Sequence, residues 1–217
     1  MWVWALIGCW VRDAEIAQKA IDPRADDTAV PDTDRPDTGP RDTGDGPLPL
    51  AALLAGDLVI TEVMRNPAAV EDVRGEWLEI TNVRAEPVDL DGMWLVDDGS
   101  DAWQVRGPTR VAAGGVVVFG ASAAPELNGG APVDVAWSGI ALGNGADEIS
   151  LKGPDDVTFD RVRWTSSSAG NSGLSMSLDP LATDAAANDL DSFWCEPLAS
   201  YGDGDHGTPG RPNARCP

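Results

Sequence analysis

Short apolar runs separated by polar joints fill the chain from residue 56 onward. Three of them, LVITEV (58–63), EWLEIT (76–81) and MWLV (93–96), are rich in Val, Ile, Leu, Trp and Thr. The joints between them carry Asn-Pro, Glu-Pro and Asp-Gly pairs, which are typical of turns. This pattern predicts an antiparallel sheet.

Five further runs extend the pattern along the chain, at 102–106, 116–119, 135–137, 148–151 and 158–164. The run VVVF (116–119) is apolar throughout, which predicts a strand that is buried on both faces. Seven or eight short strands in about 110 residues is the number found in an immunoglobulin-like sandwich. The expected fold class is therefore all-β, with a Gly- and Ser-rich tail from residue 165 that wraps the sandwich as ordered loop.

Alternation within EWLEIT assigns its side chains to two faces. Leu78 and Ile80 are expected on one face, with Trp77, Glu79 and Thr81 on the other.

The composition changes sharply before residue 56. Residues 22–47 hold eight Asp and three Arg, a net charge of −5, together with many Pro, Thr and Gly residues. Such a segment buries too little apolar surface to offset its ordering entropy. We therefore expect residues 10–55 to form a disordered acidic linker and residues 56–217 to form the folded domain.

The whole chain is strongly acidic. It carries 36 Asp and Glu against 15 Lys and Arg, a formal net charge of −21 over 217 residues. A surface of this sign repels phosphate backbones, so a nucleic-acid partner is excluded on electrostatic grounds. Solubility explains the acidic balance, and loose calcium binding by acidic patches is the alternative.

Several motifs occur in the order and spacing of a bacterial lamin-tail domain, which this chain resembles over residues 57–213. They include GEWLEI (75–80), DLDG (89–92), AGG (113–115) and the closing GTPGRPN (207–213). The resemblance implies a small immunoglobulin-like β-sandwich of the kind found on secreted and surface proteins. It also implies structural roles for a set of motif residues: Glu62, Glu76, Trp77, Glu79, Trp94, Trp194, Pro209 and Asn213. The chain departs from the family at Met93, where Trp is usual, and at Thr61, where Asn is usual.

The tetrad LIGC at residues 6–9 resembles the lipobox of a bacterial lipoprotein signal, in which the Cys is acylated and becomes the mature N-terminus. It implies a signal peptide over residues 1–9 and lipidation of Cys9. No Lys or Arg precedes Cys9, and the apolar run is short for a signal peptide, as it would be if the true start lay upstream. An apolar N-terminus that simply packs or frays is the alternative.

The three cysteines fit the same hypothesis. If Cys9 carries lipid, Cys195 and Cys216 remain as a pair that an oxidising compartment would join. Such a bridge would close a loop of about 20 residues and contribute roughly 3 kcal/mol on the chain-entropy model. Two unrelated thiols are the alternative, and no Cys/His pattern indicates a zinc site.

Three glutamates are candidates for chemistry. Glu62, Glu76 and Glu79 lie in two neighbouring strands, and two converging carboxylates would suggest glycoside hydrolysis. The alternative is that they bond to backbone groups in the sandwich. Open carboxyls about 5–9.5 Å apart would favour the hydrolase, and fully hydrogen-bonded ones would exclude it.

Other polar residues carry weaker signals. Asp191, Asp203 and Asp205 are candidate calcium ligands, although the ligand pattern of an EF-hand is absent. His206, the only histidine, has no motif that would make it part of a triad and is expected in a turn.

The sequence therefore predicts a non-catalytic binding or structural module on a bacterial cell envelope, at the outer membrane or cell surface, without a cofactor. Its expected partners are the membrane, through the lipid anchor, and a protein or glycan ligand. A carboxylate-based hydrolase and a calcium-stabilised surface module are the alternatives.

Overall fold

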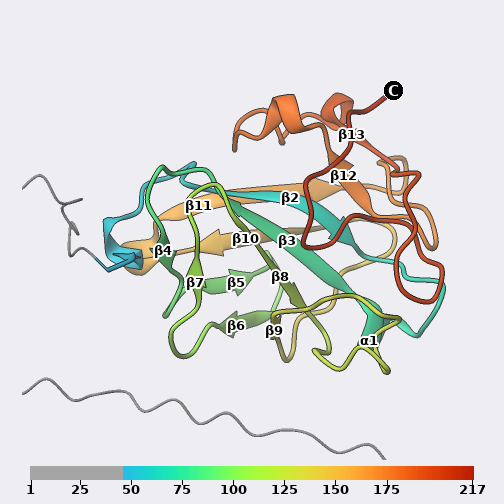
Figure 1. Ribbon diagram of the computed structural model, residues 1–217, viewed down its shortest axis with the longest axis horizontal. Coiled ribbons are helices and arrows are strands. Elements are labelled where there is room, and N and C mark those ends of the chain that lie inside the picture. The colour runs from blue at the N-terminus through green and yellow to red at the C-terminus, as the bar shows by residue number, and fades with distance from the viewer. Residues whose placement is uncertain (1–45) are drawn as a thin grey trace, which may run out of the picture. The chain divides into compact units, whose positions relative to one another are not determined.

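Residues 46–217 are the part of the chain that the computed structural model describes, and β-strands dominate them. They form an immunoglobulin-like sandwich (Figure 1). One sheet has six strands in the order β13-β12-β2-β3-β8-β9, and a second has four in the order β11-β10-β5-β6. A small third sheet has the order β1-β4-β7. The expected all-β sandwich is confirmed.

The strands are β1 Leu48–Pro49, β2 Leu58–Met64, β3 Trp77–Asn82, β4 Val88–Asp89, β5 Trp94–Val96, β6 Ala102–Gln104, β7 Arg110–Val111, β8 Val116–Gly120, β9 Val135–Ala136, β10 Asp147–Lys152, β11 Thr158–Trp164, β12 Met176–Leu178 and β13 Trp194–Cys195. One short α-helix, α1, covers Asp72–Gly75. The 3-10 helices are η1 Leu50–Ala52, η2 Pro154–Asp156, η3 Pro180–Ala182 and η4 Asp191–Phe193.

Strand β3 lies at the centre of the larger sheet. It pairs antiparallel with β2 on one side and with β8 on the other. The predicted alternation in this strand is confirmed, because Leu78 and Ile80 belong to the main core whereas Trp77 belongs to a second apolar cluster. Strand β8 is buried over residues 117–120, as its uniformly apolar run predicts.

The main core fills the space between the two large sheets. Residues of β2, β3 and β8 pack there against Leu95, Ile149 and Val162 of the smaller sheet. The second cluster joins Met64, Trp77, Val118 and Ala131. All seven residues of β2 are buried, so both faces of the large sheet are covered at this strand.

The folded structure begins earlier than the expected boundary at residue 56. Leu48 and Pro49 pair with β4, and Leu50 and Leu53 are buried in the main core. This part of the expected linker, residues 10–55, is therefore corrected, because its leucines supply the apolar surface that the acidic stretch lacks. The rest of the linker, the signal peptide and Cys9 lie outside the described residues.

Two other expectations change. The tail after residue 165 is not only loop, since it contributes β12 and β13 to the large sheet. Trp94 is 38% exposed, whereas Met93 is fully buried, so the methionine occupies the core position next to this tryptophan. Among the described residues, no helix is both long enough and apolar enough to cross a membrane.

Candidate functional site

Two glutamates face each other on the surface of the large sheet that points away from the main core. Glu62 of β2 and Glu79 of β3 are directly paired across the antiparallel ladder, and neither is more than 1% exposed. Two like charges opposite each other destabilise a sheet unless other groups satisfy them. The partners of these carboxyls therefore decide what the pair does.

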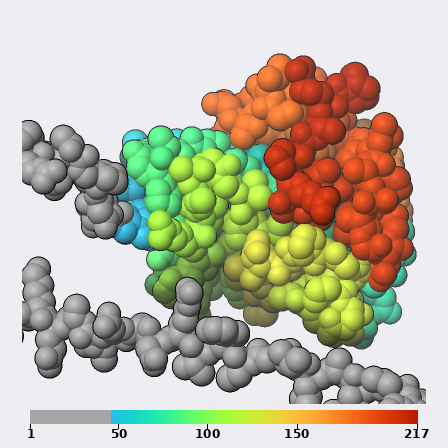
Figure 2. All heavy atoms as spheres, viewed as in Figure 1, coloured from blue at the N-terminus to red at the C-terminus, as the bar shows by residue number. Residues whose placement is uncertain are grey.

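The C-terminal segment supplies most of those partners. We call residues 205–216 the C-terminal strap, which crosses β2 and β3 and forms part of the molecular surface (Figures 1 and 2). The backbone N–H of Thr208 donates to one oxygen of Glu62 at 2.9 Å, and the hydroxyl of Thr208 lies 2.9 Å from the other oxygen. The backbone N–H of Gly210 donates to Glu79 at 2.9 Å. The strap thus covers the carboxylate pair that the sequence offered for catalysis.

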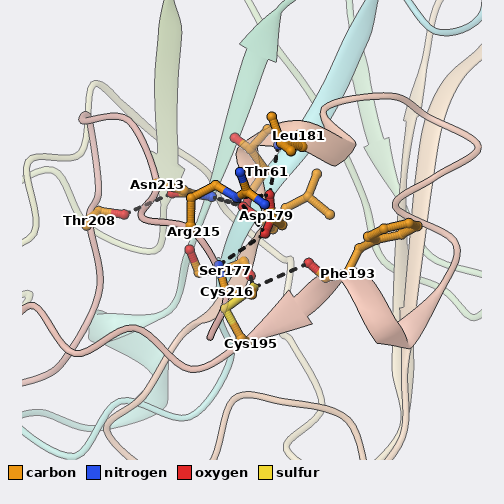
Figure 3. The surroundings of a disulfide bond; sticks show 11 residues. Thr61, Ser177, Asp179, Leu181, Phe193, Cys195, Thr208, Asn213, Arg215 and Cys216 are labelled. Atoms are coloured by element: carbon orange, nitrogen blue, oxygen red, sulfur yellow. Dashed lines mark hydrogen bonds and ion pairs between the residues drawn. A yellow bond between two sulfur atoms is a disulfide. The ribbon is translucent and has the colours of Figure 1, made fainter.

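Asn213 fastens the strap to the sheet (Figure 3). Its side-chain amide donates to the carbonyl oxygens of Thr61 and Leu178, at 2.8 and 3.0 Å. Its amide oxygen lies 2.9 Å from the hydroxyl of Thr208. Asn213 and the neighbouring Pro209 therefore have structural positions, one as an anchor and the other in the turn between Thr208 and Gly210.

A disulfide closes the far end of the strap. Cys195 of β13 is bonded to Cys216, with the Cα atoms 5.7 Å apart, which confirms the expected pairing (Figure 3). Asp179 lies beside it and accepts from the backbone N–H of Cys216 and from the side chain of Arg215. The strap is held by covalent, ionic and hydrogen bonds together.

The hydrogen-bond arrangement indicates that Glu62 is protonated. The hydroxyl of Thr208 contacts two acceptors, a Glu62 oxygen and the amide oxygen of Asn213, but it has only one proton to donate. A neutral Glu62 resolves the conflict by donating to Thr208. Burial raises the pKa of Glu62, against the opposing hydrogen bonds from Ser175 and Thr208, which favours this neutral form.

Glu79 has a similar environment. The pKa of Glu79 is raised from 4.5 to about 7, with burial as the main cause and the hydrogen bond from Thr61 acting in the opposite direction. Thr61 donates its hydroxyl to Glu79 at 2.8 Å, so the residue that departs from the family pattern takes part in the same network.

Glu76 does not join the other two glutamates. Alternation along the chain directs it to the opposite side from Trp77 and Glu79. There it is 4% exposed, and it accepts from the backbone N–H of Leu142 at 3.0 Å. The hypothesis that Glu62, Glu76 and Glu79 converge is therefore wrong, and only Glu62 and Glu79 lie together, under the strap.

The tryptophans of the motif differ in role. Trp77 is fully buried, and its indole N–H donates to the hydroxyl of Tyr201 at 2.9 Å. Trp194 is 7% exposed and donates to the carbonyl oxygen of Asn188 at 2.7 Å. Trp94 lies on the outer side of the smaller sheet, with no such contact among the described residues.

The candidate calcium ligands have other partners. Asp205 is buried and accepts from the backbone N–H groups of Ala68 and Ala69. Asp191 accepts from the hydroxyl of Ser168, and Asp203 is exposed. Within residues 46–217, no three His, Cys, Asp or Glu side chains gather in a way that would hold a metal ion. The ring of His206 contacts the carbonyl oxygen of Leu198 at 3.2 Å. The expectation that His206 lies in a turn is corrected, because it follows the turn of residues 202–204 and forms β-bridges with Leu174 and Ser200.

The sequence did not single out two other buried charges. The guanidinium of Arg65, 2% exposed, donates to carbonyl oxygens in the segments 144–145 and 165–169. Asp160 of β11 accepts from the backbone N–H of Ile60 at 2.6 Å and so links the two large sheets. Burial raises the pKa of Asp160 to about 6. Both residues tie separate elements of the fold together.

In comparisons with known protein families, residues 53–166 match the family model described as Lamin Tail Domain. This range includes the paired glutamates and ends before Trp194 and the C-terminal strap. No curated protein matches the chain.

Proposed function

The chain belongs to the Lamin Tail Domain family, and on that premise we propose that it is a non-catalytic binding module tethered to a bacterial cell envelope. The tether is a lipid on Cys9, and the ligand is a protein or glycan of the envelope. The domain is displayed at the outer membrane or cell surface.

The observation that carries the non-catalytic role is the strap over Glu62 and Glu79. Hydrogen bonds from Ser175, Thr208 and Gly210 engage the two carboxyls in holding the fold. A hydrolytic pair needs one carboxyl free to protonate a leaving group and another free to act on the sugar or on water. Covered carboxyls support a module whose function lies on its outer surface.

The disulfide supports an address outside the cytosol. Disulfides persist in oxidising compartments, such as the bacterial periplasm and the cell surface, and are rare in the cytosol. The Cys195–Cys216 bond is therefore consistent with export. The third cysteine, Cys9, is then available for a lipid anchor.

Replacement of Cys9 by Ser in the native host tests the tether. We expect the wild-type chain to sediment with membranes and the variant to appear in the soluble fraction. A wild-type chain that is soluble to the same extent as the variant would contradict the anchor.

Envelope fractions test the binding role. The purified full chain should sediment with them in a saturable way and should release no reducing sugar. A Glu79→Gln variant distinguishes the two functions, since it would abolish sugar release by a hydrolase but leave binding by a surface module unchanged. Sugar release that disappears in this variant would establish the hydrolase instead.

A further inference from the structure

A cavity of about 760 Å³ lies beside the start of β3, next to α1 and the loop of residues 137–147. Its volume is within the range of small-molecule sites, roughly 300–1,000 Å³. Its wall combines apolar side chains with carboxyls, chiefly Val73, Trp137, Ile140, Asp72, Glu76 and Asp147. None of the residues that line it is Lys, Arg or His.

The loop over the cavity is held in place by carboxylates. Three consecutive backbone N–H groups, at residues 141–143, donate to Asp101, Glu76 and Asp147 at 3.0, 3.0 and 2.6 Å. The indole N–H of Trp164 donates to the carbonyl oxygen of residue 143 at 2.7 Å. Ligand sites are usually largely pre-formed, and this loop has the bonds that pre-form one.

Two polar groups at this wall have hydrogen-bonding capacity left for a ligand. Glu76 uses Oε2 for the bond from Leu142, and its Oε1 accepts no hydrogen bond from residues 46–217. The indole N–H of Trp137 is buried and has no acceptor in that range, although the residue is only 5% exposed. Buried polar groups normally have partners, so the indole N–H of Trp137 indicates a ligand that supplies an acceptor. The unused oxygen of Glu76 faces the cavity and offers the same ligand a second bond.

The chemistry of the wall selects the class of ligand. Metal ions need several converging oxygens, and the described residues hold no such group here. A guanidinium binds a carboxylate best through both oxygens, but Glu76 has only one oxygen left. An ammonium is a compact donor that one oxygen can accept, and its apolar stem suits Val73, Trp137 and Ile140.

We propose that this cavity binds a primary ammonium group on an apolar stem, as in the side chain of a lysine residue of a partner peptide. The proposal rests on the proposed role as a binding module and names the chemistry of its ligand. Glu76 accepts from the ammonium, and the carbonyl next to the stem offers an acceptor to Trp137.

The affinity should depend on pH. The pKa of Glu76 is raised to about 8, and burial is the main cause. The hydrogen bond from Leu142 lowers this pKa, and the nearby carboxyls of Asp72, Asp147 and Asp101 raise it. An ionised Glu76 binds the cation, so the affinity should rise about tenfold or more from pH 6 to pH 8, where the ammonium is still charged.

Calorimetric titration of the full chain with Nα-acetyl-lysine methylamide at pH 8 tests the proposal. The norleucine analogue, which has the stem without the ammonium, is the matched control ligand. We expect the lysine compound to bind at least about tenfold more tightly. A second titration, with cadaverine, separates a free amine from a peptide, since equal binding of both would indicate that a free amine suffices.

Variants locate the site. Glu76→Gln keeps an oxygen for the bond from Leu142, and it should weaken lysine binding about tenfold and remove the pH dependence. Val73→Lys changes a side chain that is 75% exposed, so it should fold normally and weaken binding by repulsion at the rim of the cavity. Glu126→Gln, an exposed residue that does not line the cavity, changes the net charge equally and should have no effect.

Equal binding of the norleucine analogue, or unchanged lysine binding in both cavity variants, would overturn the proposal. The two proposals fail separately. Envelope binding by a protein that shows no preference for lysine over norleucine would remove the ammonium site and leave the binding module intact. Lysine binding without any envelope binding would support the ammonium site and contradict the role as an envelope-binding module.

Discussion

The buried glutamates should make the protein more stable in mild acid than at neutral pH, and Glu79 gives the clearest test. Its pKa is raised from 4.5 to about 7 in the folded chain. The folded state therefore binds this proton more tightly than the unfolded state does. The resulting stabilisation is fully present below pH 4.5 and is lost as the pH rises through about 7.

The magnitude follows from the two pKa values. A tenfold difference in proton affinity is worth about 1.4 kcal/mol, so the carboxyl should cost about 3 kcal/mol of stability between pH 4.5 and pH 8. Glu79→Gln removes this titration. Its amide can accept from Gly210 and donate to the hydroxyl of Thr61, so the network of this residue is preserved.

Denaturant unfolding followed by tryptophan fluorescence, at pH 5, 6, 7 and 8 with the disulfide intact, measures the effect. We expect the wild type to lose stability across this range and Glu79→Gln to lose about 2.5 kcal/mol less, because part of the effect falls below pH 5. Glu126→Gln is the control for the change in net charge and should follow the wild type. A wild type that is equally stable at pH 5 and pH 8, or a Glu79→Gln variant with the same slope, would refute the reasoning.

Four other predictions concern the strap, the core and calcium. Glu62→Gln should cost less than about 1 kcal/mol at pH 7, because the amide replaces a protonated carboxyl, and a loss above 3 kcal/mol in urea unfolding would indicate an ionised Glu62. Cys216→Ser should lower the free energy of unfolding by about 3 kcal/mol, as expected for a disulfide with a sequence separation of 21, and an unchanged urea midpoint would contradict this. Trp77→Ala should cost about 3–5 kcal/mol and Trp94→Ala less than about 1 kcal/mol, and the reverse order in the same assay would mean that the two environments have been confused. Millimolar calcium should leave the melting temperature at the value found with sodium chloride of equal ionic strength, whereas a rise specific to calcium would reveal a site.

Local pattern was sufficient to predict the strands. The apolar run at 116–119 and the alternation at Leu78 and Ile80 follow from the period of two that a strand imposes on its side chains. The cysteine count predicted the disulfide because only Cys195 and Cys216 remain once Cys9 is set aside. The strands depend on neighbouring residues, and the disulfide follows from the number of cysteines.

Features that depend on distant segments were harder to predict. The alternation that separates Leu78 from Trp77 also separates Glu76 from Glu79, so the convergence of three glutamates could have been rejected from the sequence. The role of Thr208 could not, because its bond to Glu62 spans 146 residues.

The early start of the fold did leave a signal in the sequence. Leu48, Leu50 and Leu53 form an apolar run directly after the acidic stretch, and all three pack in or against the main core. The composition of the preceding residues obscured that run. A boundary drawn from the first leucine would have matched the structure.

The intact mass of the protein purified from membranes of its native host tests the envelope assignment most directly. The account predicts a mature chain that begins at Cys9, carries added acyl mass and is two hydrogens lighter because Cys195 and Cys216 are joined. An unacylated chain that retains residues 1–8 would contradict the lipid anchor and, with it, the proposed place of this domain on the cell envelope.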